Sequence, residues 1–250
     1  GLMATPPPPG FPASSPSPTP STPAARADAA DDLVARLSRL DACAVSDALD
    51  KLDLPGCVTG LAPLSVARRI AGRVRTVKLV AAEQVVAADG PPRHLGTTAV
   101  MAARPGEVIV VEQRTGRDAG SWGGILSLGA KLRGVAGVIA DGPVRDVDEA
   151  RELDFPVYGR QPTARTARGR IAEAGTDVAV TIGDIAVAPG DYVIADGSAA
   201  VFVAAVEAER VIAVAEGIAR REAALAQALR NGADITQVMG ADYENLLKGG

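Results

Sequence analysis

The stretch Trp122-Gly-Gly-Ile-Leu-Ser-Leu-Gly-Ala-Lys-Leu-Arg-Gly-Val-Ala-Gly-Val-Ile-Ala-Asp-Gly-Pro-Val-Arg-Asp146 decides the fold. Its Gly123-Gly124 pair lets the backbone turn tightly and approach a ligand. Residues 125–132 then predict a short helix, which Gly134 ends. The apolar, β-branched run over 135–140 predicts a buried strand.

Two charged residues follow this strand. Asp141-Gly-Pro turns the chain, and Arg145-Asp146 comes directly after it. A fixed guanidinium beside a carboxylate suits a 2-oxo acid held against a divalent metal ion, Mg2+ or Mn2+. The free N–H groups at the start of the preceding helix can hold a carboxylate or enolate oxygen. We therefore expect Arg145 and Asp146 to be catalytic, Asp146 to bind the metal, and the substrate to contact Gly123, Gly124, Ile125, Leu126 and Arg145.

Each piece also has a simpler interpretation. Asp146-Val-Asp-Glu149 fits a capping box, in which Asp146 would only begin a helix. Arg145 would be a surface ion-pair residue, which is the usual fate of an isolated arginine. A Gly-Gly pair by itself is a weak signal of anything beyond a turn. The sequence leaves these alternatives open.

The order of the pieces, with Gly124 followed by twenty residues and then Arg145-Asp146, resembles the RraA-like family. That family includes the class II 4-hydroxy-4-methyl-2-oxoglutarate and 4-carboxy-4-hydroxy-2-oxoadipate aldolases. The similarity extends over about 32–232. It includes Val45-Ser-Asp-Ala-Leu-Asp, Gly60-Leu-Ala-Pro-Leu, Ala103-Arg-Pro-Gly-Glu-Val-Ile-Val-Val, Phe155-Pro-Val-Tyr and Val187-Ala-Pro-Gly-Asp-Tyr-Val-Ile-Ala-Asp196.

The resemblance implies an α/β fold: a compact β-sandwich core of the swivelling β/β/α type, surrounded by helices. It implies a homotrimer, or a dimer of trimers, with sites between subunits. The implied activity is metal-dependent retro-aldol cleavage of a 4-hydroxy-2-oxo acid to give pyruvate, with oxaloacetate decarboxylation beside it. Glu222 matches a glutamate that reaches the metal site of the adjacent subunit.

The same resemblance admits other functions. RraA itself is a protein inhibitor of an RNA-degrading endonuclease, and the signature does not separate inhibitors from enzymes. A third interpretation is that the protein is an enzyme recruited to a specialised pathway, where it acts on an altered substrate. Some aldolases carry Asp where Gly124 stands, and the segment after Asp196 is less acidic than the family pattern. These departures leave the substrate and the general acid or base open.

Composition sets further limits. Nine of the 18 prolines fall in the first 23 residues, which predicts a disordered tail over 1–28. We expect a catalytic domain over 29–232 and a C-terminal extension over 233–250. The net charge of −4 gives no reason to expect nucleic acid or a membrane as partner. Cys43 and Cys57 are interpreted as ordinary buried thiols of a cytoplasmic protein, although a disulfide between them stays possible.

The residue inventory restricts mechanism. His94 is the one histidine, so a His-rich zinc site is excluded. A Ser-His-Asp triad would have to use His94, and no nucleophile-elbow motif accompanies it. We expect His94 in a loop or at a helix start, on the surface. Lys131 is interpreted as part of a solvated helix face rather than as a Schiff-base amine. Turn chemistry explains Asp191 and Asp196.

The remaining pattern predicts a mixed series of helices and strands. Helices are expected over 30–40, from Ser46 or Asp47 to about Leu54, after Asp146, and over 206–229 with a stop at Asn231-Gly232. Strands are expected at 69–80 with a bulge at Gly72, 107–112, 155–158, 177–182, 185–188, 192–195 and 200–204.

Overall fold

The computed structural model describes residues 3–6, 10, 32–85 and 94–240. A nine-stranded mixed sheet forms the centre, in the order β1-β13-β12-β3-β4-β5-β7-β2, and β9 also pairs with β3. The strands of this sheet are β1 Cys57–Val58, β2 Ala62–Pro63, β3 Ile70–Ala81, β4 Val108–Gln113, β5 Gly137–Asp141, β7 Val157–Gly159, β9 Ile171–Thr176, β12 Tyr192–Ala195 and β13 Ala200–Val203.

Two small two-stranded sheets and the helices complete the described part. The small sheets are β6 Pro143–Val144 with β8 Gln161–Pro162, and β10 Val180–Ile182 with β11 Ile185–Val187. The helices are one at 32–38, α2 Ala42–Lys51, η1 Ala82–Gln84, α3 Thr97–Ala102, α4 Gly124–Leu132, α5 Val147–Glu152, η2 Ala205–Glu207, α6 Ala208–Arg230 and α7 Ile235–Val238.

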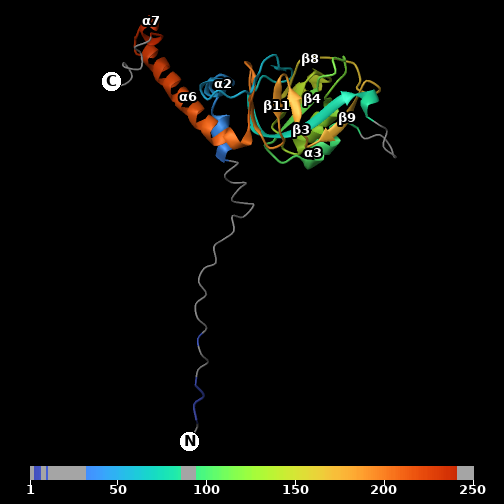
Figure 1. The fold of residues 1–250 in the computed structure, drawn as a ribbon, viewed down its shortest axis with the longest axis horizontal. Helices are drawn as coiled ribbons and strands as arrows, with labels where there is room; N and C mark the ends of the chain where they lie inside the picture. The colour runs from blue at the N-terminus through green and yellow to red at the C-terminus, as the bar shows by residue number, and fades with distance from the viewer. Residues whose placement is uncertain (1–2, 7–9, 11–31, 86–93, 241–250) are drawn as a thin grey trace.

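The long strand β3 organises the sheet. One of its edges pairs in parallel with β4, and β4, β5 and β7 continue the parallel series. Its other edge has two antiparallel partners in succession: β12 along 70–73 and β9 along 77–81. The sheet therefore divides along β3 and curls, with β3 and β4 at its centre (Figure 1).

Three apolar clusters fill the spaces that this curled sheet creates. The cluster under α3, α4 and α5 includes Val77, Leu79, Ile109 and Trp122. A second cluster packs the 32–38 helix, α2 and α6 against β12 and β13. A third lies between the main sheet and the β10–β11 hairpin, around Tyr158. The expected α/β class, with helices outside a β core, is confirmed.

Several boundaries differ from the predictions for identifiable reasons. The helix expected to begin at Ser46 or Asp47 begins at Ala42, because Asp41 caps it by accepting from the amide of Ala44 at 2.8 Å. The strand expected over 177–182 begins only at Val180, because Asp177 takes a left-handed conformation (φ 56°).

The predicted bulge at Gly72 is also wrong. The register of β3 shifts between Lys78 and Leu79, opposite β9. Gly72 pairs in register with Val193, and a Cβ there would meet the carbonyl oxygen of Gly106. This position requires glycine for close backbone approach. Strand β9 and helix α3 were not predicted, because Ile171-Ala-Glu-Ala-Gly-Thr lacks an alternating pattern and α3 spans six residues.

The predictions for the two ends of the chain can be compared with the structure only in part. Apart from 3–6 and 10, the predicted tail lies outside the described residues. Beyond residue 232, α7 packs on α6 through the buried side chain of Val238, and 241–250 lie outside the description. Both thiols are free, and Cys43 is exposed rather than buried as expected.

An ion pair joins the first helix to α6 and makes stability depend on pH. Arg36 binds Glu216 at 2.6 Å and Glu209 at 2.9 Å; the side chain of Glu216 is 29% exposed and that of Glu209 is 71% exposed. The hydrogen bond from Arg36 lowers the pKa of Glu216. The contribution of this ion pair to the free energy of unfolding is therefore present above the pKa of an unfolded glutamate, about 4.3. It is lost as pH falls through the lower pKa of Glu216 in the folded protein.

We predict that Glu216→Gln lowers the free energy of unfolding at pH 7 by up to about 1 kcal/mol, and that the difference from wild type shrinks at pH 3. Glu209→Gln is the matched control with a smaller effect, because solvent screens the more exposed partner. Chemical unfolding at the two pH values measures this, and a deficit that is constant with pH would contradict it.

Candidate active site

The chain approaches the candidate site from the carboxyl end of β5, where parallel sheets commonly bind ligands. After Gly142, the short strand β6 carries the chain to Arg145. Two hydrogen bonds tie this path to the segment before α4: the amide of Ser121 donates to the carbonyl of Pro143, and that of Arg145 to the carbonyl of Trp122, both at 2.9 Å. The two halves of the sequence motif thus lie side by side.

Asp146 faces the start of α4 rather than its own helix. Its backbone is left-handed (φ 57°), and its side chain makes no capping hydrogen bond to α5. Instead, Oδ2 accepts a hydrogen bond from the amide of Gly124 at 2.9 Å. The capping box proposed for Asp146 and Glu149 is therefore not formed. The Asp146 side chain thus lies at the positive end of the α4 dipole.

The amides expected to hold the substrate divide into two groups. The amide of Gly124 already donates to Asp146. Ile125 and Leu126 follow in the first turn of α4, where backbone amides have no acceptor within the helix. An anionic ligand would therefore find its donors at these two residues, while Gly123, in an extended conformation, makes the turn into the helix.

Arg145 supplies an uncommitted positive charge. Among the described residues, its guanidinium makes no hydrogen bond and no ion pair. Its stem packs over Gly120, where a Cβ would lie 2.6 Å from Cδ of Arg145. The described part of the chain offers Arg145 no ion-pair partner, so it does not support the interpretation of Arg145 as an ion-pair residue. Half-buried and unpaired, this guanidinium is available to a carboxylate.

Two contributors to this geometry were not singled out from sequence. Trp122 is buried, and its indole N–H donates to Oγ of Ser127 at 2.9 Å, which locks the turn that presents the Arg145 backbone. Glu149 places its carboxylate over Gly124, so that a Cβ on Gly124 would overlap Oε2 and lie 2.9 Å from Cδ. The three-residue spacing of Asp146 and Glu149 was the available signal, since it puts both at one face of a helical turn.

Comparison with known proteins fits this arrangement. The family profile described as "RraA-like: Aldolase/RraA" matches residues 42–202, which contain Gly123, Gly124, Arg145 and Asp146 but not Glu222. The chain belongs to the RraA-like family.

Solved structures of other proteins share the fold. An uncharacterised protein from Pseudomonas syringae pv. tomato superposes with a TM-score of 0.74 at 26% identity, over 84% of this chain and 98% of that one. The Streptomyces coelicolor protein RraAS2, titled an unusual member of the RNase ES inhibitor RraA family, gives a TM-score of 0.66 at 25% identity, over 76% of this chain and 94% of that one.

Sequence relatives are more distant. A Halalkalibacterium halodurans protein named "Putative 4-hydroxy-4-methyl-2-oxoglutarate aldolase" is 28% identical over 55% of this chain, and Legionella pneumophila protein DlpA is 25% identical over 66% of it. The matched regions span 60% and 26% of the lengths of these relatives, respectively.

The donor set fits a hard divalent cation. Searched over the described residues, the chain offers no cluster of three or more His, Cys, Asp or Glu side chains. The site itself supplies Asp146, with Glu149 beside the same glycine. Mg2+ commonly binds through one or two carboxylates and completes its shell with water and substrate. The pair therefore suits Mg2+ better than a metal that requires a full protein cage.

Glu222 does not join this site within one chain. Its helix, α6, packs against α2 and not against α4 or α5, and Figure 1 shows α6 beside α2 and away from α3. The buried residues of α6 all lie in its first half, between Ala208 and Ala215, whereas Glu222 is exposed in its second half. Any contact of Glu222 with Asp146 would need another subunit.

An arginine-lined cleft lies next to the path of β6. It measures about 490 Å3 and is lined in part by Gly142 and Pro143. Arg160 binds Asp141 at 2.8 Å and Arg117 binds Glu83, while Arg114 stands 3.8 Å from Asp141. Its positive charge is thus largely neutralised by internal pairs.

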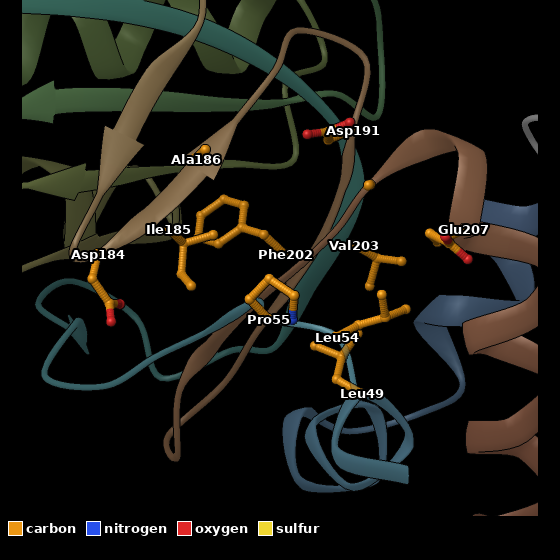
Figure 2. A pocket seen from close by; sticks show the side chains of 11 residues that line it. Leu49, Leu54, Pro55, Asp184, Ile185, Ala186, Asp191, Phe202, Val203 and Glu207 are labelled. Atoms are coloured by element: carbon orange, nitrogen blue, oxygen red, sulfur yellow. The ribbon is translucent and has the colours of Figure 1, made fainter. Parts of the chain in front are cut away.

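The pocket in Figure 2 is apolar and separate from the candidate site. It measures about 310 Å3 and lies among α2, β11, β13 and η2, with Leu54, Pro55 and Phe202 in its wall. Asp191 at its edge serves the backbone, since its carboxylate accepts from the amides of Ala188 and Ala205. No residue of the candidate site lines this pocket.

Three further expectations from the sequence, for His94, Lys131 and Asp196, agree with the structure. His94 is exposed, close to the start of α3. Lys131 is exposed and donates to the carbonyl of Leu153, which leaves no sign of an activated amine. Asp196 accepts from the amides of Ser198 and Ala42, so it is a capping residue. No helix in the described ranges is long and apolar enough to cross a bilayer.

The left-handed backbone of Asp146 gives a stability prediction. Asp146→Asn keeps a side chain that tolerates this conformation and can still accept from Gly124, whereas Asp146→Ala places an unfavourable Cβ there and removes the acceptor. We expect the alanine variant to unfold with a free energy at least about 1 kcal/mol lower than the asparagine variant.

Urea unfolding measures the difference, with Asp148→Ala as a control at a neighbouring helical position. Equal stabilities of the two Asp146 variants would mean that neither the left-handed conformation nor the hydrogen bond to Gly124 matters to the fold.

Proposed function

We propose that this RraA-like protein is a divalent-metal-dependent carbon–carbon lyase. It cleaves a 4-hydroxy-2-oxo acid by a retro-aldol step that passes through the enolate of pyruvate, and it decarboxylates oxaloacetate through the same enolate. The observation that carries this proposal is the unpaired guanidinium of Arg145 beside the Asp146 carboxylate at the start of α4. The similarity to the Halalkalibacterium protein supports the aldolase class.

Each residue of the site has a separate role in the proposed reaction. Arg145 binds the 2-oxo acid through its carboxylate and places the bond that breaks. The amides of Ile125 and Leu126 donate toward the negative charge that develops on the substrate oxygen. Asp146 holds the cation, with the Gly124 amide fixing the orientation of its carboxylate. Mg2+ or Mn2+, when bound, acts as a Lewis acid that polarises the 2-oxo group.

The proposed function also includes an oligomer. The side chains of Ile125 and Leu132 are 82% and 79% exposed on α4, beside the site, and Met101 on the adjacent α3 is 68% exposed. Large exposed apolar side chains beside a site are typical of an interface. We infer a homotrimer, or a dimer of trimers, in which the second half of α6, where Glu222 is exposed, brings Glu222 to the metal of a neighbouring subunit.

The second candidate is a protein-binding regulator of ribonuclease activity. The similarity to RraAS2 favours it, and the same exposed apolar side chains on α3 and α4 would then contact the ribonuclease. A regulator has no need of an unpaired arginine beside a carboxylate, which is why the lyase is preferred. An RraA-like enzyme with a substrate from a specialised pathway would keep the same site chemistry.

The test is pyruvate release from oxaloacetate and from 4-hydroxy-2-oxo acids, with Mg2+ and after exhaustive chelation. We expect activity that chelation abolishes and Mg2+ or Mn2+ restores. Arg145→Lys should lower kcat/KM at least about tenfold, because lysine lacks the planar two-pronged contact. Activity that survives chelation would refute the metal role, and near-normal kcat/KM in Arg145→Lys would remove Arg145 from catalysis.

The shared site predicts complementation. Asp146→Asn and Glu222→Ala should each be impaired alone, and co-expression should restore part of the activity. Mixed oligomers contain interfaces where an intact Asp146 meets an intact Glu222. The oligomeric state of each variant is checked first by light scattering. Full activity of Glu222→Ala, with no gain in mixed oligomers, would show that Glu222 is a solvated helix residue.

A further inference from the structure

The apolar pocket of Figure 2 lies between two of the three apolar clusters. Leu49 and Val203 in its wall belong to the cluster packed by α2 and α6, whereas Phe202 and Ile185 belong to the cluster around the β10–β11 hairpin or pack against it. The pocket is the space that remains between the hairpin and α2. Its volume of about 310 Å3 is at the lower end of the range typical of small-ligand sites, about 300–1,000 Å3.

The loop after α2 fixes one wall of this pocket. Leu54 and Pro55 line the wall, and the carbonyl of the next residue, Gly56, accepts a hydrogen bond from the amide of Phe202 at 2.9 Å. A Cβ on Gly56 would lie 2.2 Å from the carbonyl oxygen of Phe202, so this close approach requires glycine. Backbone contacts thus hold the wall against β13, and it needs no ligand to keep its shape.

The polar side chains that line the pocket are all carboxylates. They belong to Asp184, Asp191 and Glu207, and none of the other lining side chains carries an N–H or O–H group. Asp184, at the turn of the hairpin, is exposed and makes no hydrogen bond or ion pair within the described part of the chain. Asp191 is committed to two backbone amides. Glu207 binds Arg210 through Oε2, and its Oε1 accepts no hydrogen bond from a described residue. Asp184 and Glu207 therefore keep acceptor capacity for a ligand.

These two carboxylates stand at opposite ends of an apolar surface. Figure 2 shows Asp184 at one end and Glu207 at the other, with Ile185, Phe202 and Val203 between them. The acids come from different elements, the turn between β10 and β11 and the short helix η2. A ligand that matches this surface has an apolar middle, which buries the wall, and a positive charge at each end. An anionic ligand would be repelled by the carboxylates.

We propose that this pocket binds a linear aliphatic diamine in its doubly protonated form. One ammonium group donates to the carboxylate of Asp184, and the other donates to Oε1 of Glu207. The methylene chain between them lies against Phe202 and Leu54. The ligand connects the hairpin to the start of α6, so it binds the folded chain and stabilises it. This site shares no residue with the candidate active site and does not depend on the lyase function.

Calorimetric titration of the full chain with 1,6-diaminohexane tests this site. We expect saturable binding that weakens as the salt concentration rises, and a Tm that increases with the diamine concentration. Two compounds separate the contributions: 1,6-hexanediol keeps the methylene chain without the charges, and 1,2-diaminoethane keeps the charges with a much shorter chain. Each should bind at least about tenfold more weakly than 1,6-diaminohexane.

Two conservative substitutions remove the charges with little change in side-chain size. Asp184→Asn and Glu207→Gln should each weaken binding of 1,6-diaminohexane at least about threefold, and the double variant at least about tenfold. Asp53→Asn is the matched control, because Asp53 is an exposed acid beside Leu54 that does not line the pocket. This control should bind the diamine as the wild type does.

Three results would overturn the proposal. The first is equal affinity for 1,6-diaminohexane and 1,6-hexanediol, which would show an apolar site without charge recognition. The second is an affinity that the double variant leaves unchanged, or that Asp53→Asn lowers as much, which would show general attraction to an acidic surface. The third is the absence of binding at millimolar diamine.

Discussion

The structure depends on a single constraint, which is that one edge of β3 serves two partners. Residues 70–73 pair with β12 and residues 77–81 with β9, so the sheet cannot continue flat on that side. The curled sheet has a concave face, which the β10–β11 hairpin covers. Two separate groups of helices cover the rest of the sheet. Side chains of β3 enter all three clusters.

This division explains why the candidate site and Glu222 are far apart in one chain. Helices α4 and α5 cover the parallel strands β4, β5 and β7, so the start of α4 meets the loop that leaves β5. Helix α6 covers the antiparallel strands β12 and β13 with α2. A site that contained both Asp146 and Glu222 would have to be assembled from two molecules, and Glu222 is exposed on the second half of α6.

The sequence predicted the turn at Gly124 and the position of Arg145-Asp146 after a strand more completely than it predicted the topology. The spacing from Gly124 to Arg145-Asp146 located both the turn and the charged pair, since each has a local cause: glycine for the turn, an apolar strand, then polar residues at its end. The hydrogen bond between Asp146 and Gly124 could not be predicted, because a capping box within α5 satisfied the same residues locally. The left-handed backbone of Asp146 decides between the two arrangements, and nothing in the local pattern specifies it. Similarly, the bulge assigned to Gly72 followed from composition alone, whereas the real irregularity depends on β9, which is distant in sequence.

The overlap between Glu149 and the empty side of Gly124 has a consequence for how such sites diverge. A side chain gained at position 124 would displace the carboxylate of Glu149, which ends a flexible, exposed side chain. Positions 124 and 149 are therefore coupled, although they lie on two helices that a strand and a turn separate in the sequence.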